Sequence, residues 1–162
     1  HNPVSNMKLC SGLFRFQAAW DAGCRIGIGT DGCASNNNLS MLEEMKFAAL
    51  SAKVQSGEPT AGNDRQIFSA ATRTGCSLFD VDGGEIAVGK LADALLVRLD
   101  HPQMLGDYNL TANLVYSADN SVIDTLICDG KILMEDGKID GEEEILARNR
   151  EICRKIAAAR PG

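Results

Sequence analysis

One carboxylate, Asp31, stands where this sequence could carry out chemistry. It follows Cys24–Gly29, a short apolar and glycine-rich segment typical of a strand buried on both faces. The carboxyl ends of such strands are where α/β folds place catalytic groups. An aspartate that only caps a turn would occupy the same place. The Ser35, Asn36 and Asn37 that follow are open to the same two interpretations, as part of a site or as an ordinary polar loop.

Metal ligands are scarce in the chain. It has two histidines, His1 and His101, whereas a structural zinc site takes four nitrogen or sulfur ligands and a catalytic one usually three protein ligands. The cysteines form no C-x-x-C pair, so we expect buried, inert free thiols rather than disulfides or a zinc site. They are Cys10, Cys24, Cys33, Cys76, Cys128 and Cys153. This chain alone does not supply a convincing metal site.

Residues 27–32 formally match the pattern G-x-G-x-x-G. A dinucleotide-binding fingerprint opens directly into a helix whose N-terminus holds the pyrophosphate. Here a helix is expected only near Met41, and Asp31 would put a carboxylate inside the anion cradle. A dinucleotide-binding module is therefore a disfavoured alternative.

The size and charge of the chain narrow the possible classes. With 162 residues it has the length of about one domain, too short for a complete eight-stranded α/β barrel of about 200–250 residues. The net charge of −6 argues against nucleic acid or an anionic membrane as the main partner. We find no signal-peptide or transmembrane pattern, so we expect a cytoplasmic protein, cut from something longer.

The elements that must position these residues alternate between helix and strand over the first 80 residues, which favours an α/β layer. Leu13, Phe16 and Trp20 predict a helix ended by Gly23. Ser40 and Glu43 predict a capping box at the start of the next helix, and Asn63 and Gln66 predict the start of a helix running to about Phe79. A last helix is expected over 142–160, with Ile145, Ile152 and Ile156 on one face.

A small antiparallel module is expected after Asp82. Asp129-Gly130 predicts a type I′ hairpin, and Asp136-Gly137 a second turn. The strand candidates there are residues 94–97, 113–116, 122–128 and 131–134.

Several short motifs occur along the chain in a defined order. They are His1-Asn-Pro-Val-Ser-Asn6, Gly29-Thr-Asp-Gly32, Ala34-Ser-Asn-Asn37, Glu44-Met45, Ala71-Thr72, Gly84-Glu-Ile86, Gly89-Lys90, Ala92-Asp93 and Val115-Tyr116. Together they resemble the amidohydrolase superfamily, in particular the methylthioadenosine/S-adenosylhomocysteine deaminases and their chlorohydrolase relatives. The resemblance covers nearly the whole chain. Each motif alone is weak, and their combination is specific.

The resemblance implies an α/β fold class: the C-terminal portion of a metal-dependent-hydrolase TIM-like barrel, part of a small β-sandwich and a C-terminal helix. Residues 1–81 would form the last part of the (β/α)8 barrel, from the strand-seven loop to helix eight and the helix after it. Residues 82–140 would belong to the β-sandwich and 141–162 to the C-terminal helix. Barrel strands one to six would be missing.

The activity implied by the resemblance is hydrolytic deamination of a purine-like ring by a metal-activated water. Asp31 would be catalytic and a metal ligand, taking a proton from that water. His1, Ser35 and Asn36 would line the substrate pocket, and the loop around them would be shaped by Ser5, Asn6 and Asn37. One divalent metal is implied, with zinc favoured over iron. Because the other ligands would lie before His1, we expect the chain alone to be inactive.

The implied partners are a small-molecule substrate and either the missing barrel half or a second copy of the chain, with a homo-oligomer at full length. Neither nucleic acid nor membrane is expected. Two alternatives stay open: a non-catalytic fragment or interaction module, and a triazine-type chlorohydrolase. Ser40, Cys33 and Phe79 depart from the common family pattern, which leaves the substrate undetermined.

Overall fold

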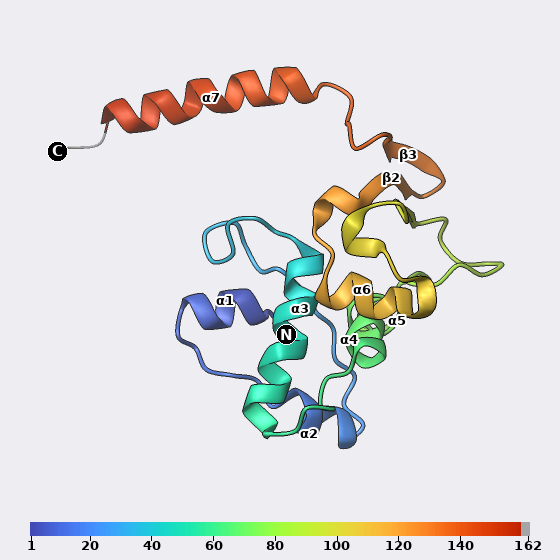
Figure 1. The fold of residues 1–162 in the computed structure, drawn as a ribbon. Coiled ribbons are helices and arrows are strands. Elements are labelled where there is room, and N and C mark those ends of the chain that lie inside the picture. Colours follow the sequence, from blue (N-terminus) through green and yellow to red (C-terminus); the bar gives the residue numbers. More distant parts are fainter. Residues whose placement is uncertain (160–162) are drawn as a thin grey trace.

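A computed structural model describes residues 1–159, leaving the side chain of residue 107 undescribed (Figure 1). Helices make up the first half, and a small sheet follows. The α-helices are α1 (Pro3–Lys8), α2 (Phe16–Asp21), α3 (Met41–Ser56), α4 (Asp64–Ala71), α5 (Arg73–Ser77), α6 (Leu110–Tyr116) and α7 (Glu142–Ala159). The strands are β1 (Ala94–Val97), β2 (Ile123–Cys128) and β3 (Lys131–Met134), and the 3-10 turns are η1 (Pro102–Met104), η2 (Asp107–Asn109) and η3 (Asn120–Val122).

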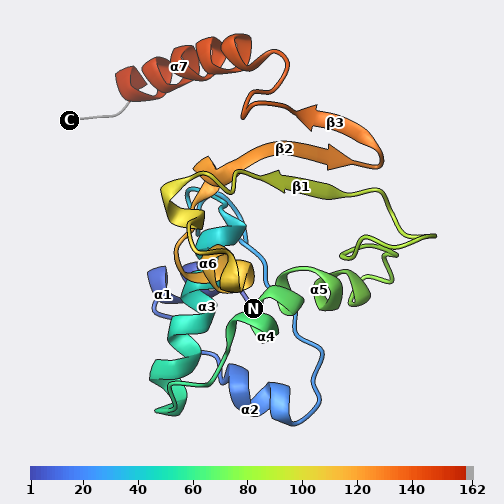
Figure 2. The same cartoon turned by 45° about the vertical axis from the view of Figure 1, so that its right-hand side comes forward.

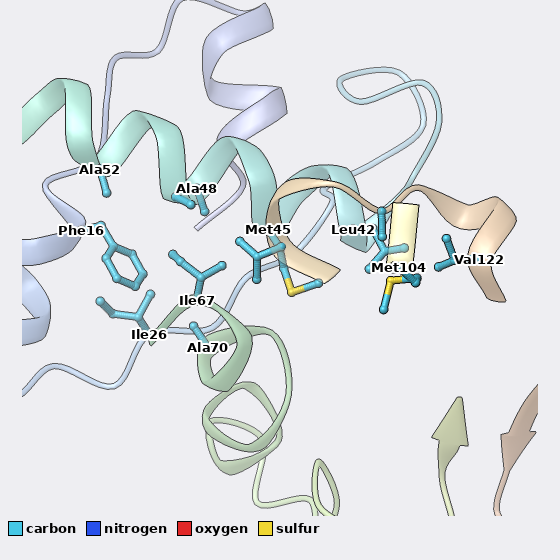
Figure 3. Packing of buried hydrophobic residues seen from close by; sticks show 13 residues of the cluster. Phe16, Ile26, Leu42, Met45, Ala48, Ala52, Ile67, Ala70, Met104 and Val122 are labelled. Carbon is cyan, nitrogen blue, oxygen red and sulfur yellow. The ribbon is translucent and has the colours of Figure 1, made fainter. Parts of the chain in front are cut away.

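Helix α3 lies at the centre of the hydrophobic core, packed against α1, α2, α4 and α6 (Figure 3). Its buried face carries alanines, including Ala48 and Ala52, which let Phe16 of α2 and Ile67 of α4 approach closely. Each buried side chain of the size of Phe16 or Ile67 contributes about 1.5–3 kcal/mol relative to exposure. Met104, Val115 and Val122 belong to the same cluster. The core therefore joins residues from both sides of the boundary predicted at 81/82.

Two of the predicted helix ends are confirmed. Gly23 has a φ of +77°, and the N–H of Cys24 donates to the Ala19 carbonyl, which is the bonding of a left-handed helix cap. At the start of α4, Asn63 and Gln66 form the full reciprocal capping box. In both places the residues involved are neighbours in sequence, so local chemistry decides the backbone.

The sheet is antiparallel, in the order β1-β2-β3 (Figure 2). Asp129 and Gly130 both have positive φ, +50° and +73°, as a type I′ turn requires. The second turn, at Asp136 and Gly137, also has two positive φ values and closes a bridge between Glu135 and Lys138. The predicted hairpin is therefore confirmed.

The prediction of a strand over residues 24–29 is wrong for the described part of the chain. The segment belongs to no helix or strand and pairs with none of the strands. Gly27 accepts from the amino terminus of His1 at 2.8 Å, and the N–H of Gly29 donates to the His1 carbonyl at 3.0 Å. These two bonds have the pattern of a parallel pair one residue long. A strand needs a neighbour of several residues, and here Ile28 donates instead to the Ala70 carbonyl of α4.

The strand predicted over 113–116 is also wrong, because these residues belong to α6. The side chain of Asn109 caps the helix by accepting from the N–H of Ala112 at 3.0 Å. Leu114 and Val115 then turn toward the core, which also holds Ala118. The apolar run is therefore helical because α6 packs on α3 and α4 rather than on a sheet.

The helix predicted from residue 63 to about 79 is divided at Thr72, whose φ and ψ of −125° and −100° are not helical. The Ala70 carbonyl accepts from Ile28, and the Thr72 hydroxyl donates to the Phe68 carbonyl at 2.7 Å. A tertiary bond thus uses a carbonyl that a continuous helix would need.

Two further helix starts differ from prediction. Leu13 lies outside α2 and is exposed. The hydroxyl of Ser40 accepts from the Glu43 N–H at 3.3 Å, but Glu43 does not reciprocate. Its carboxylate accepts instead from the amide of Asn38 at 2.6 Å, and the N–H of Ser40 donates to Asn38 at 3.1 Å. The intervening asparagine divides the predicted box into two separate contacts.

The expectation of buried cysteines is wrong as well. All six are free thiols, but five are exposed and Cys76 is only half-buried. Several lie at turns or element ends, such as Cys10 after α1 and Cys128 at the hairpin.

Helix α7 extends away from the rest of the molecule (Figures 1 and 2). None of its residues 142–159 is buried, and Ile145, Ile152 and Ile156 are each about half exposed. Across residues 1–159, no helix combines the length and apolarity needed to cross a membrane.

Candidate active site

The site is built where the extended segment 24–30 leaves the core. Ile26 packs among the buried residues and so anchors this segment in the core. Backbone hydrogen bonds of Gly27 and Gly29 with His1 hold the start of the chain beside it. The segment ends at Asp31, an exposed residue with a φ of +59°. Aspartate tolerates this left-handed conformation better than most residues. The end of the segment thus presents a carboxylate to the surface.

Two serines from different segments converge on Asp31. The hydroxyl of Ser5 in α1 and that of Ser35 in the following turn each donate to Asp31 Oδ2 at 2.7 Å. The bond from Ser35, the bond from Ser5 and a backbone bond from Gly32 lower the pKa of Asp31 below its usual value. Both hydroxyls engage the same oxygen, Oδ2, which leaves Oδ1 without a side-chain donor among the described residues.

The backbone of His1 is held by Gly27 and Gly29, and its imidazole packs on Phe14. Its ring is 4.9 Å from that of Phe14, and the residue is half-buried. Within residues 1–159, neither ring nitrogen has a hydrogen-bond partner although both are shielded from solvent. Shielded polar nitrogens without partners are costly. This position therefore suits a polar group that the described residues do not provide.

The remaining predicted site residues are spread around this centre. Asn36 is buried, and its amide is engaged with Glu44 and with the N–H of Leu39 rather than with Asp31. Asn37 is exposed, with its oxygen 2.5 Å from the ammonium of Lys8. Asn6 is half-buried and bonds through its backbone to residues 2 and 11. The structure thus brings Ser5 and Ser35 into contact with Asp31. The side chains of Asn6, Asn36 and Asn37 make no contact with its carboxylate among the described hydrogen bonds.

Sequence reasoning missed the roles of Glu44 and Lys8. Glu44 is fully buried on α3, where it accepts from the N–H of Val4 at 3.1 Å and from the amide of Asn36. Burial raises the pKa of Glu44, and these two hydrogen bonds oppose the rise. Glu44 precedes the buried Met45 and lies one turn before Ala48. A glutamate among the buried positions of a helix is a sequence signal that its carboxylate has hydrogen-bond partners, because charged side chains are rarely buried without them.

Lys8 links the same two segments from outside. Its ammonium donates to the Ala34 carbonyl at 2.9 Å as well as to Asn37. Lys8 is exposed, so this link contributes less to stability than the buried one.

The described residues do not complete a metal site. Nowhere in residues 1–159 do three or more histidine, cysteine, aspartate or glutamate side chains gather as metal ligands would. Asp31 fits the role of one ligand, because it is an exposed carboxylate whose Oδ1 has no side-chain donor among the described residues. Any further ligands must come from outside the described part of the chain.

A surface hollow with a volume of about 380 Å³ lies elsewhere. It is lined by Arg25, Arg73 and Lys90 and by acidic residues such as Asp82, and it contains none of the site residues. The site around Asp31 is therefore identified by its chemistry and not by an enclosed cavity.

Comparison with known proteins identifies related sequences. The sequence model of a family described as the amidohydrolase family matches residues 1–133. The 5-methylthioadenosine/S-adenosylhomocysteine deaminase 1 of Archaeoglobus fulgidus is 42% identical over 163 residues, which cover 98% of this chain and 39% of that protein.

Two solved structures have a similar fold. An adenosine deaminase from Xanthomonas campestris with bound zinc has a TM-score of 0.92 at 31% identity, covering 98% of this chain and 37% of the other. An atrazine chlorohydrolase from Arthrobacter aurescens complexed with zinc has a TM-score of 0.83 at 25% identity, covering 93% and 34%. The chain thus spans less than two fifths of the length of these three proteins.

Proposed function

Because this chain belongs to the amidohydrolase family, we propose that it supplies one carboxylate, Asp31, to a metal-dependent site that deaminates a purine-like ring by hydrolysis. The observation that carries the proposal is the convergence of Ser5 and Ser35 on the carboxylate of Asp31. The deaminase names of the similar proteins support the choice of reaction.

The role proposed for Asp31 follows from its hydrogen bonds. Its Oδ2 already accepts two hydroxyl protons, so Oδ1 is the atom left to meet a cation or to accept a proton. The hydrogen bonds that lower the pKa of Asp31 favour its ionised form. A divalent metal, when bound, lowers the pKa of water toward neutrality. We propose zinc for this role, because the similar adenosine deaminase structure contains it.

We propose further roles for the neighbouring residues. Ser5 and Ser35 fix the orientation of the Asp31 carboxylate. The ring nitrogens of His1 have no hydrogen-bond partner within residues 1–159, and one of them would meet a polar group of the substrate. Asn6 and Asn37 shape the adjoining loops. Contact of Asn36 with substrate stays a prediction, since its amide already serves Glu44 and Leu39.

For the fold, we propose that residues 1–81 are the last part of a (β/α)8 barrel, 82–140 part of a β-sandwich and 141–162 a C-terminal helix. The one-residue parallel pair between His1 and the segment 27–29 supports this, because adjacent barrel strands are parallel. The similarity to longer amidohydrolase structures supports it as well. The substrate would be a small molecule, held with residues from the rest of the protein.

The proposal is tested with Asp31→Asn in the full-length protein. Loss of general acid–base function alone typically lowers a rate by about 10² to 10⁴, and loss of a ligand should also lower the bound metal. Ammonia release from adenosine-type nucleosides and metal content per protein are the two measurements. Asp124→Asn is the matched control, because Asp124 also accepts from a hydroxyl, that of Thr125, but lies in β2. An Asp31→Asn variant that works at nearly the rate of the unmodified protein would refute the role.

A further inference from the structure

Two buried side chains connect the segments that carry the serines. Glu44 of α3 is fully buried, and its Oε2 accepts from the N–H of Val4 in α1 at 3.1 Å. Its Oε1 accepts from the side-chain amide of Asn36. The oxygen of that same amide accepts from the N–H of Leu39 at 3.2 Å. A continuous series of hydrogen bonds thus runs from α1 through Glu44 and Asn36 to Leu39, at the end of the loop that follows Asp31.

The direction of these bonds restricts the residue at position 44. The series begins and ends at backbone N–H groups, Val4 and Leu39, which can only donate. An asparagine amide has one accepting and one donating end. If Asn36 accepts from Leu39, it must donate to position 44, which therefore has to accept twice. The two donors reach different atoms of Glu44, Oε2 and Oε1, so both terminal atoms must accept. An ionised carboxylate meets this requirement, whereas a glutamine amide has one accepting oxygen and one donating nitrogen.

The two linked segments are the ones that hold Asp31. Ser5 is adjacent to Val4, and Ser35 is adjacent to Asn36. Their hydroxyls reach the same oxygen, Asp31 Oδ2, each at 2.7 Å. Their simultaneous contact requires α1 and the loop after Asp31 to keep their relative positions. The burial of both linking side chains shields their hydrogen bonds from competition with water.

We propose that Glu44 and Asn36 form a hydrogen-bonded clasp that holds Ser5 and Ser35 on Asp31, so that Glu44 is a positioning residue for the active carboxylate. The clasp itself rests on geometry alone, and its effect on turnover rests on the function proposed above. It also accounts for a fully buried carboxylate, which is costly unless its hydrogen bonds are satisfied.

The test is a reversal of polarity in the full-length protein, with three variants: Glu44→Gln, Asn36→Asp, and the two combined. Glu44→Gln sets two amide donors against each other, and Asn36→Asp sets two carboxylates against each other. In the double variant, glutamine accepts from Val4 and donates to position 36, where aspartate accepts from both glutamine and Leu39. The number of charges then equals that of the unmodified protein.

Two measurements distinguish the clasp from the proposed function. Hydrogen–deuterium exchange over residues 1–9 and 32–40 reports the clasp directly, and kcat for deamination reports its consequence. Each single variant should exchange at least about tenfold faster there and lose about 10- to 100-fold in kcat, since misplacement of about 1 Å can cost about 10² in rate. The double variant should recover both to within about fivefold. Recovery would not follow if the residues served only as general packing.

Glu43→Gln is the matched control, because it makes the same substitution at the next position of the same helix. Glu43 accepts a single bond, from Asn38, which a glutamine oxygen can also accept. Unchanged exchange in Glu44→Gln, or a double variant as impaired as the single ones, overturns the clasp. Restored exchange without restored kcat overturns its role in positioning. If the unmodified protein releases no ammonia, the proposed function fails while the exchange data still decide on the clasp.

Discussion

At the scale of single residues, the carboxylate of Asp31 is the chemically distinctive group. Charge-assisted hydrogen bonds are stronger than neutral ones, and here Ser5 and Ser35 direct two of them to one oxygen. Their effect is to favour the ionised form and to restrict rotation of the carboxylate. A charged carboxylate held in one orientation suits the metal-ligand role proposed for Asp31.

Replacing Ser5 or Ser35 by alanine should raise the pKa of Asp31, with the larger rise for Ser35→Ala because its bond is the main cause of the lowering. A carboxyl group whose pKa is lowered by folding stabilises the protein above its unfolded pKa of 3.8, and this contribution is lost as pH falls through the folded value. The variant with both serines replaced should therefore lose less free energy of unfolding on acidification than the unmodified protein does.

The carboxyl carbon shift of Asp31, followed by NMR against pH, measures this effect. Ser121→Ala serves as the control, because Ser121 is the main cause, followed by Gln103, of the lowering of the pKa of a different carboxylate, Asp119, to about 2. That variant should raise the pKa of Asp119 and leave Asp31 unchanged. A titration midpoint of Asp31 that is the same in the serine variants as in the unmodified protein would contradict the two hydroxyl contacts.

At the scale of elements, short-range capping decides where helices begin. Asn63 accepts from the N–H of Gln66 at 3.0 Å, and Gln66 accepts from the N–H of Asn63 at 3.1 Å. The box at Ser40 is incomplete because Asn38 intervenes. Helix α4 therefore depends on its local cap more than α3 does, since the longer α3 is also buried along one face.

Asn63→Ala should lower the free energy of unfolding by about 1 kcal/mol, in the range of about 0.5–2 kcal/mol found for lost N-caps. Urea unfolding followed by circular dichroism measures the change. Thr60→Ala provides the control: Thr60 is an exposed residue of the preceding loop, and its replacement should have little effect. A loss equal to that of the control would show that the box contributes nothing.

At the scale of the whole molecule, the chain combines one well-packed core with much exposed apolar surface. The residues around α3 are buried, whereas β1 and β3 expose Leu95, Leu96 and Ile132 by about half, and α7 has no buried residue. The site has the same character, since Asp31 is well oriented but no set of three ligands gathers in the described residues. Both observations agree with the proposal that the chain functions together with further parts of the protein.

This chain by itself should therefore show no deaminase turnover, and it should bind zinc weakly, because Asp31 is the only ligand proposed within it. Calorimetric titration with zinc and an ammonia-release assay on the 162-residue chain check this. The Asp31→Asn chain is the comparison, and it should bind even less zinc. Robust activity of the unmodified chain would show that the ligand assignment is incomplete.

The sequence by itself determined the turns and helix caps, because these depend on residues that are neighbours in the chain. The Asp129-Gly130 hairpin, the left-handed cap at Gly23 and the Asn63 box follow from backbone preferences within a few positions. The family also followed from the sequence, because the order of its motifs is itself sequence information. Asp31 could be singled out for the same reason.

Only the tertiary structure decided which distant groups meet. Residues 24–29 pair with no strand, and residues 110–116 form helix α6, which packs on α3. The N–H of Ile28 bonds to the carbonyl of Ala70 at the point where the predicted helix is divided. The convergence of Ser5 and Ser35 on Asp31, and the link through buried Glu44, join segments far apart in sequence. Local preferences carry no information on such contacts, because their energy exists only once the core has brought the segments together.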